Sequence, residues 1–288
     1  MQTKRQIRQL LESAQLHPKK RLGQHFLVDL NLMRLLVESA AISGDDIVLE
    51  VGCGTGSMTQ ALAEKAARVI AVESDRSLAS IAASQTAGNK NVELINCDVL
   101  AGKHRLNARV WRAVEAARLR RSGRLLLVSN LPYNIASPLM MNLVEGPLVA
   151  DAMHITVQKE AADRMTAAAG GGNYGALSIF LAATGSARRI RVLKPSVFWP
   201  KPKVDSAMVS FSRDRREAGR IRDFTVFAQV VRLFMAHRRK TLAACARLGP
   251  PGHAYDWKSV FEICGVSPKA RPQELPVDKY IEMANMIL

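Results

Sequence analysis

Short apolar runs that alternate with helical patterns constrain the fold of this chain more than any other feature. Between residues 47 and 130 the runs IVLEV, RVIAVE, VELINCD and RLLLVS follow one another, and helical patterns lie between them. Strands that are separated by helices form βαβ units and pair in parallel. Sheets of this type bind ligands at the carboxyl ends of their strands. The sequence therefore predicts an α/β domain with a mostly parallel sheet and a site at one sheet edge.

The remaining chain predicts a second, smaller domain. Further strands are expected at DAMHITVQ, ARRIRVL and SAMVSFS, and the charged run SRDRREAGRIRD follows them. Beyond this run we expect only helices, at 223–247, 256–264 and 276–287. We therefore predict a catalytic domain over 1–212, which begins with a basic segment at 1–25, and an all-helical domain over 213–288.

The charge balance of the chain indicates a phosphate-rich partner. Its 288 residues include 41 Lys or Arg and 25 Asp or Glu, which gives a formal net charge of +16. Nucleic acid is the simplest partner for such a charge. The alternative is that the basic surface only keeps the protein in solution.

The cysteines and the apolar runs exclude several classes of protein. The four cysteines form no CxxC pair, so we expect neither a zinc site nor disulfides, and we expect no other metal. No run reaches the ~18 apolar residues of a membrane helix. The N-terminus lacks the apolar core of a signal peptide, although its basic character leaves a short organellar presequence open. We expect a cytoplasmic, monomeric protein without membrane contact.

A glycine-rich loop and two carboxylates follow three successive strands. Gly52, Gly54 and Gly56 stand between the first strand and the next helix, where glycine lets the backbone turn sharply and approach a ligand. The second strand ends in Glu73, which suits the hydroxyls of a ribose, and the third ends in Asp98, which suits an adenine amino group. A site with carboxylates and no basic phosphate clamp fits S-adenosylmethionine (SAM), whose sulfonium is itself positive.

The tetrapeptide NLPY follows the fourth strand of this series, at the same sheet edge. Asn130 offers a side-chain carbonyl, and a neighbouring backbone carbonyl offers a second acceptor for the N–H groups of a nucleobase amine. Pro132 keeps the turn rigid because its φ is fixed and it has no N–H. Tyr133 offers a face on which a base can stack. The alternative is a strand-to-loop turn with a core tyrosine.

A series of motifs then resembles one family in order over nearly all of the chain from about Lys19. These are KKRLGQHFL, LEVGCGTGSMT, AVESD, SNLPYNIASPL, VQKEAADRM, VFWPKPKVDSAMV, AHRRKTL and GVSPKARPQELPVDKYIEMAN. Together they resemble the small-subunit ribosomal RNA adenine dimethyltransferases (KsgA type). The resemblance implies a Rossmann-like SAM-dependent methyltransferase that dimethylates N6 of adjacent adenosines, acts during ribosome biogenesis and needs no metal.

The resemblance also implies roles for individual residues. Tyr133 and Phe198 would sandwich the target base, and Asn130 would lie nearest the methyl group. His25 stands where the family often has Asn. The implied cofactor contacts are His25, Leu27, Gly52, Gly54, Glu73, Asp98 and Asn130.

Basic residues predict where RNA binds. Residues 188–240 hold 15 Lys or Arg against 4 Asp or Glu, which suggests a basic cleft above the base pocket. Arg232 and Arg239 are seven residues apart, so a continuous helix would place them on one face, flanked by Arg238 and Lys240. A second basic stretch covers 102–124, and we expect four of its arginines to contact RNA or a ribosomal neighbour: Arg112, Arg118, Arg120 and Arg121. The alternative is that this stretch is only a solvated helix with a long loop.

Two other functions stay open on the sequence alone. The first is an antibiotic-resistance methyltransferase that acts on large-subunit ribosomal RNA, although NLPY together with the C-terminal RPQEL favours the small subunit. The second is a non-catalytic RNA-binding assembly or transcription factor. The presence of Gly52, Glu73, Asp98 and Asn130 argues against the second, because a protein that only binds RNA has no need of them.

Overall fold

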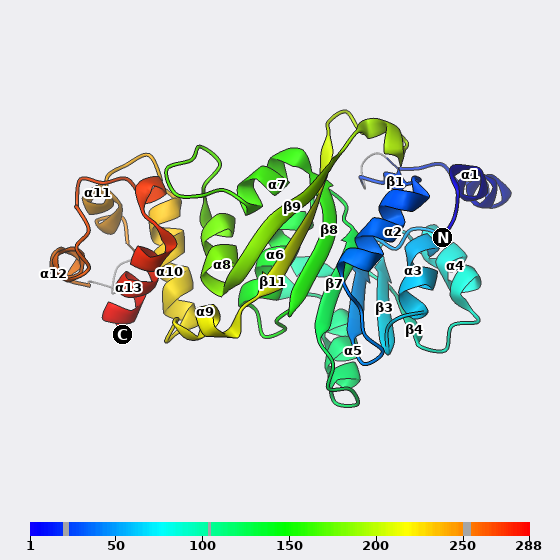
Figure 1. Ribbon diagram of the computed structural model, residues 1–288, viewed down its shortest axis with the longest axis horizontal. Helices are drawn as coiled ribbons and strands as arrows, with labels where there is room; N and C mark the ends of the chain where they lie inside the picture. Colours follow the sequence, from blue (N-terminus) through cyan, green and yellow to red (C-terminus); the bar gives the residue numbers. More distant parts are fainter. Residues whose placement is uncertain (20–22, 103–104, 250–254) are drawn as a thin grey trace. The chain divides into compact units, whose positions relative to one another are not determined.

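The computed structural model describes residues 1–19, 23–102, 105–249 and 255–288 (Figure 1). Within these residues no helix combines the length and the apolar character that crossing a membrane requires. The chain forms two compact units. One comprises Met1–Ala162 and Arg188–Ser212, and the other comprises Asp163–Ala187 and Arg213–Leu288. The boundary that we expected at 212/213 stays a prediction, and the internal contacts also group residues 163–187 with the C-terminal helices.

A seven-stranded sheet in the order β4-β3-β2-β7-β8-β11-β9 dominates the first unit. Pairing is parallel from β4 to β8, and β11 then joins β8 in the antiparallel sense. This arrangement confirms the predicted α/β fold. The strands are β2 (Ile47–Val51), β3 (Arg68–Glu73), β4 (Val92–Asn96), β7 (Leu125–Asn130), β8 (Ala152–Gln158), β9 (Gly185–Leu193) and β11 (Ser206–Arg213).

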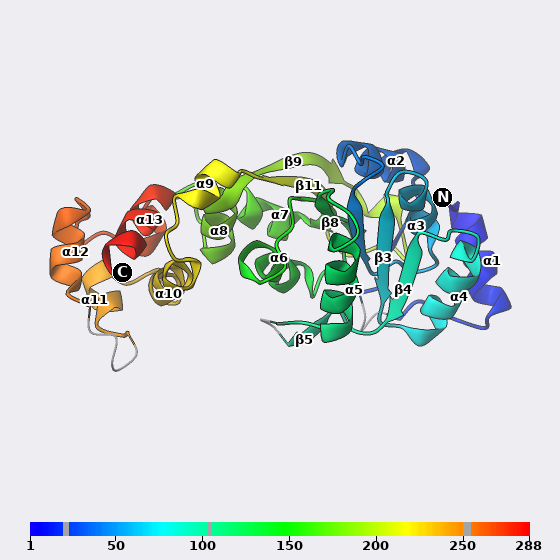
Figure 2. The same cartoon turned by 90° about the horizontal axis from the view of Figure 1, so that it is seen from below.

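Helices cover both faces of the sheet. Figure 2 shows α2 and α3 on one side and α5 and α6 on the other. All of β2 and nearly all of β7 are therefore buried, which explains their uninterrupted apolar sequences. The α-helices that precede β8 are α1 (Lys4–Ser13), α2 (Leu30–Ser39), α3 (Ser57–Ala63), α4 (Arg76–Thr86), α5 (Ala108–Arg118) and α6 (Ala136–Glu145).

Two short ladders complete the strands that the structure describes. β1 (Phe26–Leu27) pairs with β10 (Phe198–Trp199), and β5 (Leu100–Gly102) pairs with β6 (Arg105–Leu106). The β1–β10 pair matters for the site because it joins the N-terminal segment to the stretch just before β11.

The C-terminal unit is helical, but one expected helix is broken. The range 223–247 divides into α10 (Phe224–Met235) and α11 (Leu242–Ala246). Thr241 caps α11, and the N–H of Leu242 donates to the Ala270 carbonyl rather than to a carbonyl of the preceding turn. The other helices that begin after β8 are α7 (Lys159–Met165), α8 (Ala176–Thr184), α9 (Arg215–Gly219), α12 (Trp257–Ile263) and α13 (Val277–Met286).

The apolar stripe that the sequence places on α10 packs into the core of this unit. Phe227, Val231 and Phe234 are fully buried, and Phe224 lies against Phe180 and Phe227 at ring-centroid distances of 5.9 and 5.7 Å. The spacing of three and four residues between these side chains in the sequence predicts this packing, and the structure confirms it.

The basic stretch has a helical pattern at 103–121, of which α5 covers Ala108–Arg118. Residues 103 and 104 lie outside the described part of the chain. The Arg118 guanidinium donates to the Val149 carbonyl at 2.6 Å and so has a structural bond. Arg112, Arg120 and Arg121 are exposed. Of the four arginines predicted to contact RNA or the ribosome, these three are exposed, and the contact itself stays a prediction.

We predict that His154 makes the protein less stable in mild acid. This residue is 6% exposed on β8, and its Nδ1 lies 3.0 Å from the Ser39 hydroxyl. Burial, with the positive charges of Arg124 and Arg188, lowers the pKa of His154 to about 4. Because the unfolded chain takes up this proton near pH 6.5, stability falls as the pH drops from about 6.5 to about 4.

The test compares denaturant unfolding at pH 7 and pH 5. His154→Gln should reduce the loss of unfolding free energy between these values by about 2 kcal/mol relative to the wild type. His17→Gln, which changes an exposed histidine, should leave the loss unchanged. An identical pH dependence in the wild type and in His154→Gln would show that His154 titrates normally.

Candidate active site

A pocket opens at the carboxyl ends of β2, β3 and β7, within the first unit. Nine of the ten residues predicted for cofactor binding and catalysis line it, and only Phe198 does not. The nine are His25, Leu27, Gly52, Gly54, Glu73, Asp98, Asn130, Pro132 and Tyr133. The parallel sheet and the β1–β10 pair thus bring together side chains that lie more than 100 positions apart in the sequence.

The loop between β2 and α3 requires glycine for two reasons. Gly52, Gly54 and Gly56 all have positive φ, at +75°, +58° and +79°. A Cβ on Gly52 would lie 3.0 Å from the Pro132 ring, and a Cβ on Gly54 would lie 2.9 Å from the Phe26 ring. The loop therefore needs glycine for its backbone conformation and for its close contacts.

Glu73 is buried at the end of β3 and accepts hydrogen bonds from two backbone N–H groups. Its Oε2 accepts from the N–H of Gly54 and its Oε1 accepts from the N–H of Asp75, both at 2.9 Å. Burial raises the pKa of Glu73, although these N–H groups lower it in part. A carboxylate has about four acceptor positions, so Glu73 keeps capacity for two ligand hydroxyls.

Asp98 lies beyond the end of β4 and is exposed. Its Oδ1 accepts from the N–H of Leu100 at 2.9 Å, which holds the side chain at the pocket rim. The structure thus places both predicted carboxylates, Glu73 and Asp98, at the same pocket.

Two neighbours orient the amide of Asn130 at the end of β7. Its Nδ2 donates to the His25 carbonyl at 2.8 Å, and its Oδ1 accepts from the Thr156 hydroxyl. The amide oxygen therefore has a defined direction and one further lone pair. The N–H of Ile135 donates to the Pro132 carbonyl at 3.2 Å and closes the turn that follows.

Tyr133 stacks on His25 rather than on Phe198. The His25 and Tyr133 ring centroids are 5.5 Å apart with 24° between the planes. The Tyr133 hydroxyl lies 2.6 Å from the Ser206 hydroxyl, and Nδ1 of His25 lies 2.7 Å from the Pro200 carbonyl. Both rings are thus fixed at the pocket wall.

Phe198 lies in the core, which differs from the expected base sandwich. It is 2% exposed and belongs to the cluster around Leu27 and Met33. In the β1–β10 pair Phe198 stands opposite Leu27, and Trp199 stands opposite Phe26. Because side chains alternate along a strand, Trp199 stacks on Phe26 while Phe198 points into the core.

Sequence reasoning missed Glu50, which also lines the pocket. This side chain is 1% exposed, and its Oε2 accepts from the Thr59 hydroxyl at 2.6 Å. Burial raises the pKa of Glu50 to about 8. The available signal was an acidic residue inside the otherwise apolar strand sequence IVLEV, directly before the glycine loop.

The other unit holds four of the basic residues predicted to bind RNA, and all four are exposed: Arg232, Arg238, Arg239 and Lys240. Arg238 donates to the backbone carbonyls of Tyr174 and Gly172, at 2.9 and 3.2 Å. Because α10 ends at Met235, Arg232 and Arg239 do not share one helical face, and that prediction is wrong. Arg232 is on the last turn of α10, whereas Arg238, Arg239 and Lys240 follow it in a turn.

Comparison with known proteins assigns the chain to a family. The model of the ribosomal RNA adenine dimethylase family matches residues 15–288. The chain belongs to this family. It is 36% identical over 285 residues to ribosomal RNA small subunit methyltransferase A of Pediococcus pentosaceus, covering 97% of this chain and 93% of the relative. The corresponding protein of Kineococcus radiotolerans is 37% identical over 289 residues, covering 97% and 89%.

Solved structures support the same fold. A dimethyladenosine transferase from Plasmodium falciparum matches with a TM-score of 0.69 and 23% identity, over 88% of this chain and 94% of that one. The 23S ribosomal RNA methyltransferase ErmE matches with a TM-score of 0.62 and 22% identity, over 91% and 99%. The protein is a SAM-dependent methyltransferase with a Rossmann-like sheet, and SAM is its methyl donor.

The residues of the pocket fit this cofactor. Gly52 and Gly54 line the pocket without side chains, so a ligand can approach the backbone of the loop closely. Glu73 keeps acceptor positions for hydroxyl groups, and Glu50 and Asp98 add acidic groups to the same lining. This set of acceptors suits a ligand that carries a ribose.

We predict that Glu50 lowers the free energy of unfolding as the pH rises. The unfolded carboxyl ionises near pH 4.5 and the folded one near 8, so stability is lost as the pH rises between these values. Glu50→Gln, which is neutral and of similar shape, should lose about 2–3 kcal/mol less unfolding free energy than the wild type between pH 6 and pH 9.

Denaturant unfolding across this pH range measures the effect. Glu38→Gln, at an exposed position of α2, should follow the wild-type curve. If Glu50→Gln follows it too, Glu50 is ionised in the folded protein at neutral pH.

Proposed function

We propose that the protein transfers methyl groups from SAM to N6 of adenine, twice per base, on adjacent adenosines of small-subunit ribosomal RNA. The names of the curated relatives and of the family support this substrate. The observation that carries the proposal is the oriented Asn130 amide beside the glycine loop and Tyr133, because these groups together suit an exocyclic amine of a base.

Bound SAM supplies an electrophilic methyl group, and the chain supplies position and hydrogen-bond acceptors. The second lone pair of Asn130 Oδ1 accepts an N–H of the target amine, while the Thr156 hydroxyl and the His25 carbonyl keep the amide in place. Such fixed acceptors lower the barrier without a covalent step by the protein. After the first transfer the amine keeps one N–H, so the same acceptor serves the second.

Tyr133 holds the ring of the target base. Its hydroxyl is anchored at Ser206 and one of its faces meets His25. Stacking requires a base that has left its helix, so an unpaired segment of RNA is the substrate. We assign no base contact to Phe198 in this conformation because it is buried in the core.

We further propose that the helices of 213–288 bind the assembling small subunit through phosphate contacts, and that the protein acts as a monomer in the cytoplasm. Arg232, Arg239 and Lys240 are the exposed basic residues that we assign to this role. We expect a smaller contribution from Arg238, because its guanidinium already binds two backbone carbonyls. Exposed basic side chains position RNA without reading its sequence.

We predict that Asn130→Ala abolishes most methylation. Loss of the oriented acceptor should reduce turnover roughly 100-fold or more, as removal of comparable hydrogen-bonding groups does in other enzymes. The measurement is mass spectrometry of nucleosides from small-subunit and large-subunit ribosomal RNA after incubation with protein and SAM. Asn31→Ala, at an exposed position of α2, is the control and should retain activity.

Two results would contradict the proposal. Dimethyladenosine in large-subunit RNA alone would favour the resistance-type function, and its absence from both RNAs would favour a binding factor. Full turnover by Asn130→Ala would remove this residue from the mechanism.

We predict that Glu73→Ala weakens SAM binding. Two ribose hydroxyls lose a charged acceptor, which should cost about 1.5–3 kcal/mol in affinity. Titration calorimetry with SAM measures it, and circular dichroism checks that the variant is folded. Glu64→Ala, at an exposed position just after α3, should bind normally. Unchanged affinity in folded Glu73→Ala would place the ribose elsewhere.

A further inference from the structure

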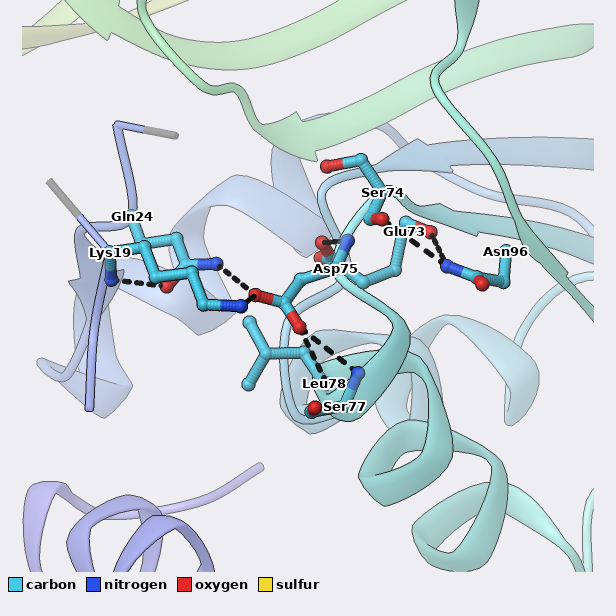
Figure 3. A network of polar contacts seen from close by, with 8 residues as sticks. All are labelled: Lys19, Gln24, Glu73, Ser74, Asp75, Ser77, Leu78 and Asn96. Carbon is cyan, nitrogen blue, oxygen red and sulfur yellow. Dashed lines mark hydrogen bonds and ion pairs between the residues drawn. The ribbon is translucent and has the colours of Figure 1, made fainter. Parts of the chain in front are cut away.

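Asp75 lies two residues after Glu73 and caps the N-terminus of α4. Its Oδ1 accepts from the N–H groups of Ser77 and Leu78, at 3.0 and 3.4 Å. Figure 3 shows the carboxylate between this helix start and the N-terminal segment. The side chain is only 4% exposed, which is unusual for a capping group.

The second oxygen of Asp75 binds two residues from much earlier in the chain. Oδ2 accepts from Nζ of Lys19 at 2.7 Å and from Nε2 of Gln24 at 3.3 Å. The backbone N–H of Lys19 also donates to Oε1 of Gln24, at 2.7 Å. One carboxylate therefore binds both residues, and the two are also joined to each other (Figure 3).

Gln24 is itself part of the pocket wall. The next residue, His25, accepts from Asn130 through its carbonyl and stacks on Tyr133 through its ring. Leu27 follows in β1 and also lines the pocket. On the other side, the N–H of Asp75 donates to Glu73. Asp75 thus connects the expected ribose acceptor with the wall next to Asn130.

Capping alone does not explain this arrangement. Asn caps a helix about as well as Asp, because only an acceptor oxygen is needed. Asp29 caps α2 with the same pair of bonds, to Asn31 and Leu32, and forms no ion pair within the described part of the chain. Burial of Asp75 opposes its charge, but the bonds from Lys19, the helix N–H groups and Gln24 prevail and lower its pKa. The negative charge of Asp75 is therefore needed for the ion pair with Lys19 and not for capping the helix.

We propose that Asp75 is a positioning residue for methyl transfer. Its carboxylate binds Lys19 and Gln24, and through Gln24 it fixes His25 and Leu27 at the cofactor pocket. This proposal rests on the proposed function, because it takes His25 and Leu27 as contacts of SAM.

The decisive variant is Asp75→Asn, which keeps the cap acceptor and the side-chain size but removes the charge. We expect KM for SAM and the dissociation constant for SAM to rise roughly tenfold, as the loss of a hydrogen bond to a charged group does. We expect KM for RNA and the melting temperature to stay close to the wild-type values. Asp29→Asn is the matched control and should change none of these.

The partner residue gives an independent test. Lys19→Met should reproduce the tenfold rise, and this variant should fold because its side chain is 45% exposed. Lys19→Arg should retain near-normal affinity. Both single changes break the same ion pair. The double variant Asp75→Asn with Lys19→Met should therefore bind SAM no more weakly than either single variant.

The outcomes separate the two proposals. If the wild type binds no SAM by calorimetry, the proposed function fails and the positioning role fails with it. If the wild type binds SAM but Asp75→Asn and Lys19→Met bind it equally well, only the positioning role is overturned. Equal losses in Asp75→Asn and Asp29→Asn, or additive losses in the double variant, would also overturn it.

Discussion

One buried carboxylate organises the site. Glu73 accepts the N–H of Gly54 from the glycine loop and the N–H of Asp75 from the start of α4. These bonds join the turns that follow β2 and β3 at the edge of the sheet. A buried carboxylate is costly unless it is well bonded, and here the backbone supplies the bonds. The position of the glycine loop therefore depends on Glu73, and the rest of the pocket is built around both.

The opposite wall comes from segments distant in sequence. The N-terminal segment pairs with β10, stacks His25 on Tyr133 and accepts from Asn130 through the His25 carbonyl. Asn130 is in turn held by Thr156 of the neighbouring strand β8. The group proposed to meet the target amine is thus fixed from two sides before any ligand binds, and such preorganisation is the main contribution that a protein makes to a displacement of this kind.

The charges are divided between two tasks. The chain as a whole carries a net charge of +16, which suits RNA, but the pocket is lined by Glu50, Glu73 and Asp98. Burial raises the pKa values of Glu50 and Glu73, so the pocket limits its own negative charge. The cofactor therefore meets a pocket of limited charge that is rich in hydrogen-bond acceptors, while the polyanionic substrate meets exposed basic side chains.

The sequence alone determined the parallel sheet, the glycine loop and the placement of Glu73, Asp98 and Asn130. Local patterns identify the strands and the helices between them, and strands that run in parallel end at one edge of the sheet, so the residues that follow them lie at the same edge. The order of the strands, β4-β3-β2-β7-β8-β11-β9, is a result of the tertiary structure. Only the tertiary structure decided that Phe198 points into the core, that His25 stacks on Tyr133, that the helix expected at 223–247 breaks after Met235, and that Asp75 binds Lys19. Each of these involves a contact with a part of the chain that is distant in sequence, and no local pattern of residues encodes such a contact.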